Sequence, residues 1–179
     1  MEYFVAQVRT RREASFIRLA EQVDLPEVRR FLWPRRMLKI RRGGRTRKEE
    51  VPVFPGYVFV ETEEMTPEVH EKLRRLPYFL RFLPENEDVR PLSESDKRVV
   101  TQLLSHGEVV QPSKVSFDEN SRIRVLEGPL KGLEGRITRV DRRKGRAKVR
   151  LDLYDNAFEV DFAFESMEGL KTAQSSGNT

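Results

Sequence analysis

A glycine-bearing stretch in the C-terminal third of the chain constrains the fold most. Glycines stand at 128, 132 and 135, between the apolar run 123–126 and a second apolar strand through Ile137 and Val140. Glycines so placed supply tight turns and positive φ, and they leave the backbone open to a partner. A turn crowded with cations follows at 141–150. This pattern predicts a small β-barrel whose cationic turn binds nucleic acid.

Composition excludes several classes of protein. The 179 residues suffice for one domain and a small second one. The absence of cysteine excludes disulfides and thiolate zinc sites, and the two histidines, His70 and His106, are far apart in the sequence. No apolar run reaches the roughly 18–20 residues that span a bilayer, and the N-terminus has no secretory pattern. We therefore expect a cytoplasmic monomer with no metal, no cofactor and no membrane contact.

Charge is segregated along the chain. The segment 29–48 carries ten cations and no acid, and the segment 120–150 carries eleven cations against three acids. The segment 151–170 carries six acids and no cation. Such segregation produces local fields that the net charge of +5 hides. Two basic segments predict a polyanionic partner.

Apolar periodicity predicts two domains. The N-terminal part alternates between strand and helix patterns in the order β-α-β-β-α-β-α, which indicates an α+β sandwich of antiparallel strands and helices. The predicted strands are 3–8, 31–40, 51–60 and 79–83, with a hairpin tip at 41–45, and the predicted helices begin near 12, 66 and 93. Residues 123–170 give about five short strands, which suit an SH3-like barrel. The period-two alternation of 151–154 and 159–164 favours a constitutive β-barrel over a helical alternative. The predicted divisions are an N-terminal domain 1–106, a linker 107–121, a barrel 122–170 and a disordered tail 171–179.

Two motifs carry a resemblance to a known family. The stretch Gly128–Ile137 resembles the KOW motif of transcription and ribosomal proteins, and Phe54-Pro55-Gly56-Tyr57-Val58-Phe59-Val60 precedes it. Both motifs in this order resemble the NusG family of bacterial transcription elongation factors. Tyr3–Val8 and Trp33-Pro34 match other parts of the family pattern. The family's Pro-Gly-Val…Phe-Gly pattern is replaced here by residues 77–83. The resemblance implies an NGN-type α+β domain followed by a KOW barrel.

The family acts without catalysis. Its N-terminal domain lies on the clamp helices of RNA polymerase, contacts upstream non-template DNA and suppresses pausing. Carried over by motif position, the resemblance implies polymerase contacts by Tyr57 and Phe59, and then by Phe4 and Phe79. Tyr57 and Phe59 share one strand face while Val58 and Val60 take the other, and the sequence leaves open which face is core. The hairpin cations are expected to contact the DNA backbone without reading sequence: Arg41, Arg42, Arg45, Arg47 and Lys48.

The barrel decides between general and operon-specific members of the family. General members dock Rho or a ribosomal protein through an Ile-Phe-Gly-Arg stretch, where this chain has Leu153–Asn156. Asp155 and Asn156 depart from that pattern, which makes Rho or ribosome docking doubtful. The basic turn and the segment 105–110 instead resemble the LoaP group, operon-specific antiterminators that recognise a leader RNA hairpin. The expected RNA contacts are Lys131, Arg136, Arg139, Arg142, Arg143, Lys144, Arg146 and Lys148.

The main prediction is therefore a processive antitermination factor that binds RNA polymerase and a structured leader RNA. Its first alternative is a housekeeping NusG protein that acts in elongation and termination through Rho or the ribosome. A second alternative is a ribosomal or assembly protein that uses the KOW motif for rRNA alone, and the Phe54–Val60 motif argues against it. An enzyme is the third, but the acidic pairs in the chain have no nucleophile, phosphate loop or metal cluster around them.

Overall fold

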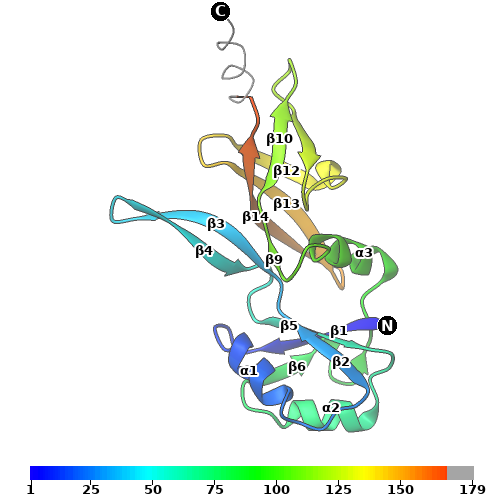
Figure 1. Ribbon diagram of the computed structural model, residues 1–179. Coiled ribbons are helices and arrows are strands. Elements are labelled where there is room, and N and C mark those ends of the chain that lie inside the picture. Colours follow the sequence, from blue (N-terminus) through cyan, green and yellow to red (C-terminus); the bar gives the residue numbers. More distant parts are fainter. Residues whose placement is uncertain (169–179) are drawn as a thin grey trace, which may run out of the picture. The chain divides into compact units, whose positions relative to one another are not determined.

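The chain forms two compact units in the computed structural model, which describes residues 1–168 (Figure 1). The first unit holds residues 1–35, 52–101 and 152–156. Among the described residues, the second unit holds 36–51, 102–151 and 157–168. The tail predicted at 171–179 lies outside the described residues. We describe each unit by itself.

A four-stranded antiparallel sheet forms the centre of the first unit, in the order β2-β5-β1-β6. Its strands are β1 (Glu2–Val8), β2 (Val28–Leu32), β5 (Tyr57–Thr62) and β6 (Phe79–Phe82). The remaining elements are α1 (Glu13–Ala20), α2 (Pro67–Arg74), α3 (Glu94–Leu103), β7 (Pro84–Glu85) and β8 (Asp88–Val89). Sequence periodicity predicted this α+β sandwich of antiparallel strands and helices, and the structure confirms it.

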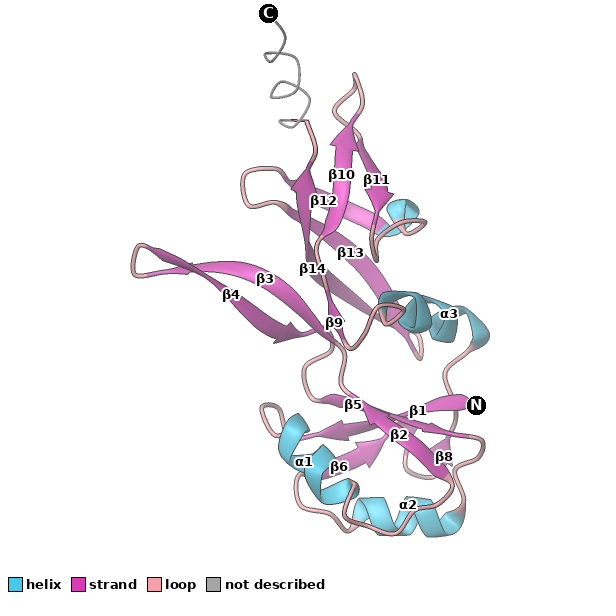
Figure 2. Cartoon of the chain, viewed as in Figure 1, coloured by secondary structure: helices cyan, strands magenta, loops and turns pink. Residues whose placement is uncertain are grey.

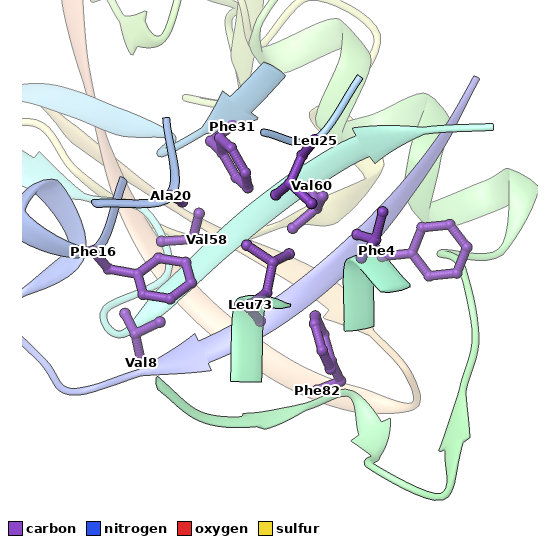
Figure 3. Packing of buried hydrophobic residues seen from close by; sticks show 12 residues of the cluster. Phe4, Val8, Phe16, Ala20, Leu25, Phe31, Val58, Val60, Leu73 and Phe82 are labelled. Atoms are coloured by element: carbon purple, nitrogen blue, oxygen red, sulfur yellow. The ribbon is translucent and has the colours of Figure 1, made fainter. Parts of the chain in front are cut away.

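The core of the first unit lies between one face of the sheet and the helices α1 and α2. Phe4, Ala6 and Val8 of β1 and Val58 and Val60 of β5 point into it because alternate strand residues share a face. The helices complete this core. Figure 3 shows Phe16 of α1 and Leu73 of α2 packed within it. Each such side chain contributes about 1.5–3 kcal/mol through burial.

Local signals set where the elements begin and end. Thr66 caps α2 by accepting a hydrogen bond from the Val69 amide at 3.2 Å, and Pro67 follows at the first helical turn. The predicted strand 31–40 is interrupted at Trp33-Pro34, because β2 ends at Leu32 and β3 begins at Arg35. Proline has no N–H for a sheet ladder, which accounts for the break. The predicted strand 51–60 is likewise two strands, separated by a turn at Gly56 (φ +80°).

The second unit consists almost entirely of strands (Figure 2). A five-stranded sheet has the order β11-β10-β14-β13-β12, and a three-stranded sheet has the order β4-β3-β9. The elements are β3 (Arg35–Arg42), β4 (Arg45–Pro52), β9 (Val109–Val110), β10 (Ser113–Phe117), β11 (Ile123–Glu127), the 3-10 turn η1 (Glu134–Arg136), β12 (Ile137–Asp141), β13 (Arg146–Leu153) and β14 (Asn156–Ser166). The predicted β-structure of the C-terminal module is confirmed.

The stretch expected to be a linker, 107–121, contains regular structure. β9 pairs with β3, and β10 pairs with β11 in antiparallel and with β14 in parallel orientation. The parallel pairing joins residues more than 45 positions apart, so no local sequence pattern reveals it. Of the three glycines that dominate the sequence here, Gly128 and Gly132 have positive φ as predicted, and Gly135 lies within η1.

Candidate functional site

The turn at Gly56, just before β5, is hydrogen-bonded to β1 and to α1 in the first unit. Gly56 has φ +80°, and a Cβ at this position would lie 3.0 Å from the Val8 carbonyl oxygen. The Gly56 amide donates to Glu13 Oε1 at 2.7 Å, and the Gly56 carbonyl accepts from the Val8 amide at 2.7 Å. Glu13 is buried, with 1% of its surface exposed. The turn therefore requires glycine, and the carboxylate of α1 satisfies its buried N–H.

Two of the four residues expected at the polymerase, Tyr57 and Phe59, share the face of β5 that lies opposite the α1–α2 core. Phe59 stands across from Val5 in the register of β1, and Tyr57 stands across from Gln7. Phe59 is completely buried and packs against Phe54 with ring centroids 5.8 Å apart. Tyr57 is half-buried. Tyr57 is thus the accessible aromatic residue of this pair.

Phe4 and Phe79 lie on the other face of the sheet. Phe4 stands across from Val60 and is buried in the α1–α2 core. Phe79 packs beside Phe16 and Phe82, with ring centroids 6.4 and 4.9 Å away. The four side chains therefore do not form one exposed aromatic patch, because they are divided between the two faces of the sheet. Their role in binding polymerase stays a prediction.

The hairpin β3–β4 presents the cations expected to contact DNA. Gly43 and Gly44 have φ of +56° and +77°, as a two-residue hairpin turn of the primed type requires. The predicted tip at 41–45 is confirmed. All five cations are exposed: Arg41, Arg42, Arg45, Arg47 and Lys48. Their exposure suits sequence-independent attraction to phosphates.

The basic turn, residues 142–145, connects β12 to β13 and is held at both ends by hydrogen bonds. Asp141 Oδ1 accepts from the Lys144 amide at 2.9 Å, and the Gly145 carbonyl accepts from the Phe164 amide of β14 at 2.8 Å. Gly145 has φ +63°. Arg142, Arg143 and Lys144 are exposed on this fixed backbone. The turn therefore presents three cations from a pre-organised position.

Aromatic side chains lie beside the basic turn, although they come from distant strands. The Arg142 guanidinium carbon lies 3.6 Å from the ring centroid of Phe117 in β10. Phe117 in turn meets Phe164 of β14 edge to face, with centroids 5.9 Å apart. The sequence showed no stacking aromatic pair in this turn. Phe117 was missed because it belongs to the stretch interpreted as a linker.

Charged residues of β3 and β13 lie close enough to affect one another in the second unit. Arg146 Nη2 donates to the Lys39 carbonyl of β3 at 2.8 Å. Burial lowers the pKa of Arg36, the positive charge of Arg146 lowers it further, and Asp161 opposes both. Asp161 also pairs with Lys148, with Nζ and Oδ1 3.7 Å apart. The acids of this region thus partly neutralise cations that were predicted to bind RNA.

Six of the eight residues predicted to bind RNA lie on or beside the basic turn: Arg139, Arg142, Arg143, Lys144, Arg146 and Lys148. Lys131 and Arg136 precede β12, whereas the basic turn follows it. A strand of this length separates them from the turn by roughly 17 Å. The structure therefore does not bring Lys131 and Arg136 to the turn. It brings Lys39 near the turn instead.

Leu153–Asn156, the stretch that the sequence aligned with the family's docking motif, spans the turn between β13 and β14. Leu153 is buried, and the Tyr154 hydroxyl donates to the Arg90 carbonyl at 2.6 Å. Residues 152–156 belong to the first unit by their contacts. Burial raises the pKa of the Tyr154 hydroxyl. Tyr154 and Asp155 both have positive φ, at 48° and 64°, which Asp tolerates better than most residues.

Two classes of feature are absent from the part of the chain that the structure describes. Residues 1–168 contain no group of three or more His, Asp or Glu side chains arranged to hold a metal ion. No helix within the same residues is long and apolar enough to cross a membrane.

Comparison with known proteins identifies both modules. The family model described as "Transcription termination factor nusG" matches residues 1–101, and the KOW motif matches residues 119–152. The "Transcription termination/antitermination protein NusG" of Escherichia coli K12 is 33% identical over 130 residues, which cover 71% of this chain and 70% of the relative. The protein of the same description from Pasteurella multocida is 32% identical over 128 residues, covering 70% of this chain and 69% of the relative.

A solved structure supports the fold. The chain described as "Domain interaction in Thermotoga maritima NusG" matches with a TM-score of 0.61, at 22% identity, over 90% of this chain and 93% of that chain. At that identity the likeness shows the fold alone. The family model covers more than half of the present chain, and the Escherichia coli relative is aligned over more than two thirds of it. The chain therefore belongs to the NusG family of transcription factors, with an N-terminal NusG domain and a C-terminal KOW motif.

Proposed function

We propose that this chain is a general NusG protein that binds RNA polymerase and acts in elongation and termination, with its KOW motif docking Rho or the ribosome. The observation that carries this proposal is a sequence identity of about a third to relatives whose names describe termination and antitermination. The sequence had offered this function as the first alternative. The comparisons support it better than the prediction of an operon-specific antiterminator.

Polymerase binding rests on the outer face of β5 in this proposal. The Gly56 turn and its Glu13 contact fix where β5 begins, so the position of Tyr57 is set by the buried framework. Phe59 supports that face from within the fold, since it is completely buried. A half-buried aromatic side chain on a rigid strand is a suitable anchor for a protein interface.

Docking of Rho or the ribosome would use the turn Leu153–Asn156. Asp155 and Asn156 had made docking of Rho or the ribosome doubtful. The comparisons do not support that doubt, because the relatives named above are general NusG proteins. The apolar character of Leu153 and Tyr154 is kept at this turn. Docking through it requires the turn to exchange its present contact, Tyr154 with Arg90, for the partner.

A single-round transcription assay with bacterial RNA polymerase and Rho tests this function. The proposal predicts less pausing when the chain is added alone and earlier release of transcripts when Rho is also present. Tyr57→Ala should reduce both effects, because it removes the polymerase anchor. Unchanged pausing and unchanged termination at saturating protein would contradict the proposal.

A second candidate function is antitermination directed by a leader RNA hairpin, as the LoaP-like motifs predicted. The specific observation in its favour is the basic turn, whose three exposed cations are held by Gly145 and Asp141. Such a turn suits the phosphate walls of an A-form helix. Nanomolar, hairpin-selective binding by the full chain, lost in Arg142→Ala/Arg143→Ala/Lys144→Ala, would support this function. Equal binding to all RNAs with a steep salt dependence would leave only attraction to phosphate.

A further inference from the structure

The second unit contains a cleft beside the basic turn to which no function above assigns a ligand. It measures about 460 Å³ and lies among the hairpin β3–β4, the basic turn and β14. Lys39 and Lys48 line it from the hairpin, and Arg142 and Lys144 line it from the basic turn. Four apolar residues also line the cleft: Met37 and Ala163, which are partly exposed, and Leu38 and Phe164, which are buried. The two basic segments of the sequence therefore meet at one site.

Hydrogen bonds fix the walls of this cleft relative to one another. Arg146 Nη2 donates to the Lys39 carbonyl at 2.8 Å, which joins β13 to the hairpin. The Phe164 amide donates to the Gly145 carbonyl at 2.8 Å, which joins β14 to the basic turn. β3 also pairs with β9 in the three-stranded sheet. These contacts all lie within the second unit, so the cleft is pre-formed.

The lining has the chemistry of a nucleotide site. Its volume falls within the range of about 300–1,000 Å³ that is typical of small-ligand pockets, in which apolar walls surround a few polar groups. An apolar surface accepts the face of a base, and a cationic rim accepts the phosphodiester. Arg142 is already stacked on Phe117, and a guanidinium plane is itself a surface on which bases stack. Gln111 and Glu165 supply polar groups at the edge of the cleft.

Arg146 carries an unsatisfied donor beside the cleft. Arg146 lines the cleft, and its Nε atom is buried without a hydrogen-bond partner. Buried donors without partners are costly and rare, and those in native proteins often await a ligand or a water. The Arg146 side chain adds a further positive charge to the lining.

We propose that this cleft seats one unpaired nucleotide of a single-stranded nucleic acid, with the base on the Met37–Ala163 surface and the phosphodiester on the cationic rim. The hairpin and the basic turn then hold the same strand, whereas the sequence assigned DNA to one and RNA to the other. The inference depends on neither polymerase binding nor Rho docking. It differs from the hairpin-RNA candidate because the base must be unpaired.

Two variants of the full chain distinguish binding of a base in the cleft from attraction between the cations and the phosphates. Ala163→Leu fills the apolar surface and leaves every cation in place. Lys39→Ala/Lys48→Ala removes two exposed cations of the rim, and Arg45→Ala/Arg47→Ala removes the same charge nearer the hairpin tip as a matched control. Far-UV circular dichroism and thermal melting of each variant establish that it is folded.

The measurement is fluorescence anisotropy with a labelled RNA of about ten nucleotides, its DNA counterpart, and both strands carrying central abasic sites. Ala163→Leu should weaken binding of the intact strand about tenfold and leave the abasic strand unchanged, as expected for the loss of one stacked base. The Lys39/Lys48 variant should lower the slope of log affinity against log salt by about 1.4, with a smaller change for the Arg45/Arg47 control.

A preference for RNA or for DNA in these data identifies the strand that the cleft takes. Equal affinities for intact and abasic strands, together with equal losses in the two double variants, would overturn the proposal. Failure of the wild-type chain to bind polymerase would instead bear on the general NusG function and leave this inference standing.

Discussion

At the residue scale, the Phe54–Val60 motif owes its conformation to a carboxylate more than 40 positions away. Glu13 Oε1 accepts the hydrogen bond of the Gly56 amide inside the first unit. The motif itself, with its Pro-Gly turn, is visible in the sequence. The carboxylate is not, because Glu13 reads as an ordinary acidic residue in the first turn of a helix.

Replacement of Glu13 tests this contact. Glu13→Ala leaves the buried Gly56 N–H without an acceptor, and we expect the free energy of unfolding to fall by about 1–3 kcal/mol. Glu13→Gln keeps an acceptor oxygen and should lose much less. Urea denaturation of the two variants measures the difference. Equal losses would show that the hydrogen bond does not hold the turn.

Gly145 offers a second test at this scale. Its φ of +63° opposes a side chain, and so does the Phe164 carbonyl oxygen, which lies 3.0 Å from the position that a Cβ would occupy. Gly145→Ala should therefore destabilise the protein by about 1–2 kcal/mol and disturb the basic turn. Gly135→Ala is the matched control, because Gly135 has open space around its Cβ position and an ordinary φ. Thermal unfolding that ranks the two variants the other way would refute this account of the turn.

At the element scale, β5 carries a structural residue, Phe59, and, two positions away, Tyr57, the residue proposed to contact polymerase. Phe59 is completely buried against Phe54, whereas Tyr57 is half-buried on the same face. Phe59→Ala should cost about 3–5 kcal/mol of stability. Tyr57→Ala should cost far less stability and instead weaken binding to RNA polymerase. Denaturation together with a polymerase pull-down distinguishes the two, and a stability loss at Tyr57 equal to that at Phe59 would contradict the assignment.

The elements also show what a sequence can predict. Period-two alternation located β1, and the Gly43-Gly44 pair located the hairpin turn, because both signals are local. The sequence missed most of β4 and assigned β10 to a linker. The break at Trp33-Pro34 follows from proline chemistry and could have been predicted. The burial of Phe4 and Phe59 could not, since alternation says which residues share a face but not which face a helix covers.

At the scale of the whole molecule, charge segregation in the sequence becomes a spatial arrangement in the second unit. The cations of 29–48 and of 120–150 meet where Lys39 lies beside Arg146. Local patterning predicted a polyanion partner, but the meeting of the two segments depends on β3 pairing with β9, a contact between residues about 70 positions apart. The sequence placed six of the residues predicted to bind RNA near the turn. It did not show that β12 separates Lys131 and Arg136 from the turn.

This arrangement predicts a salt response that depends on both basic segments. Affinity for any nucleic acid should fall steeply with salt, with a slope that decreases for each phosphate contact removed. Arg142→Ala/Arg143→Ala should reduce the slope, and Arg41→Ala/Arg42→Ala should reduce it further in the combined variant. Anisotropy titrations across a salt series provide the slopes. A combined variant with the slope of the wild type would show that neither segment contacts phosphate.

The central claim is that the chain is a NusG-family factor whose N-terminal domain binds RNA polymerase. The most direct measurement is the affinity of the full chain for core RNA polymerase, compared with that of Tyr57→Ala, by biolayer interferometry. The account predicts saturable binding by the wild type and an affinity at least about tenfold lower for the variant, as loss of an interface anchor implies. Absence of saturable binding by the folded wild type, or an undiminished affinity of Tyr57→Ala, would contradict it.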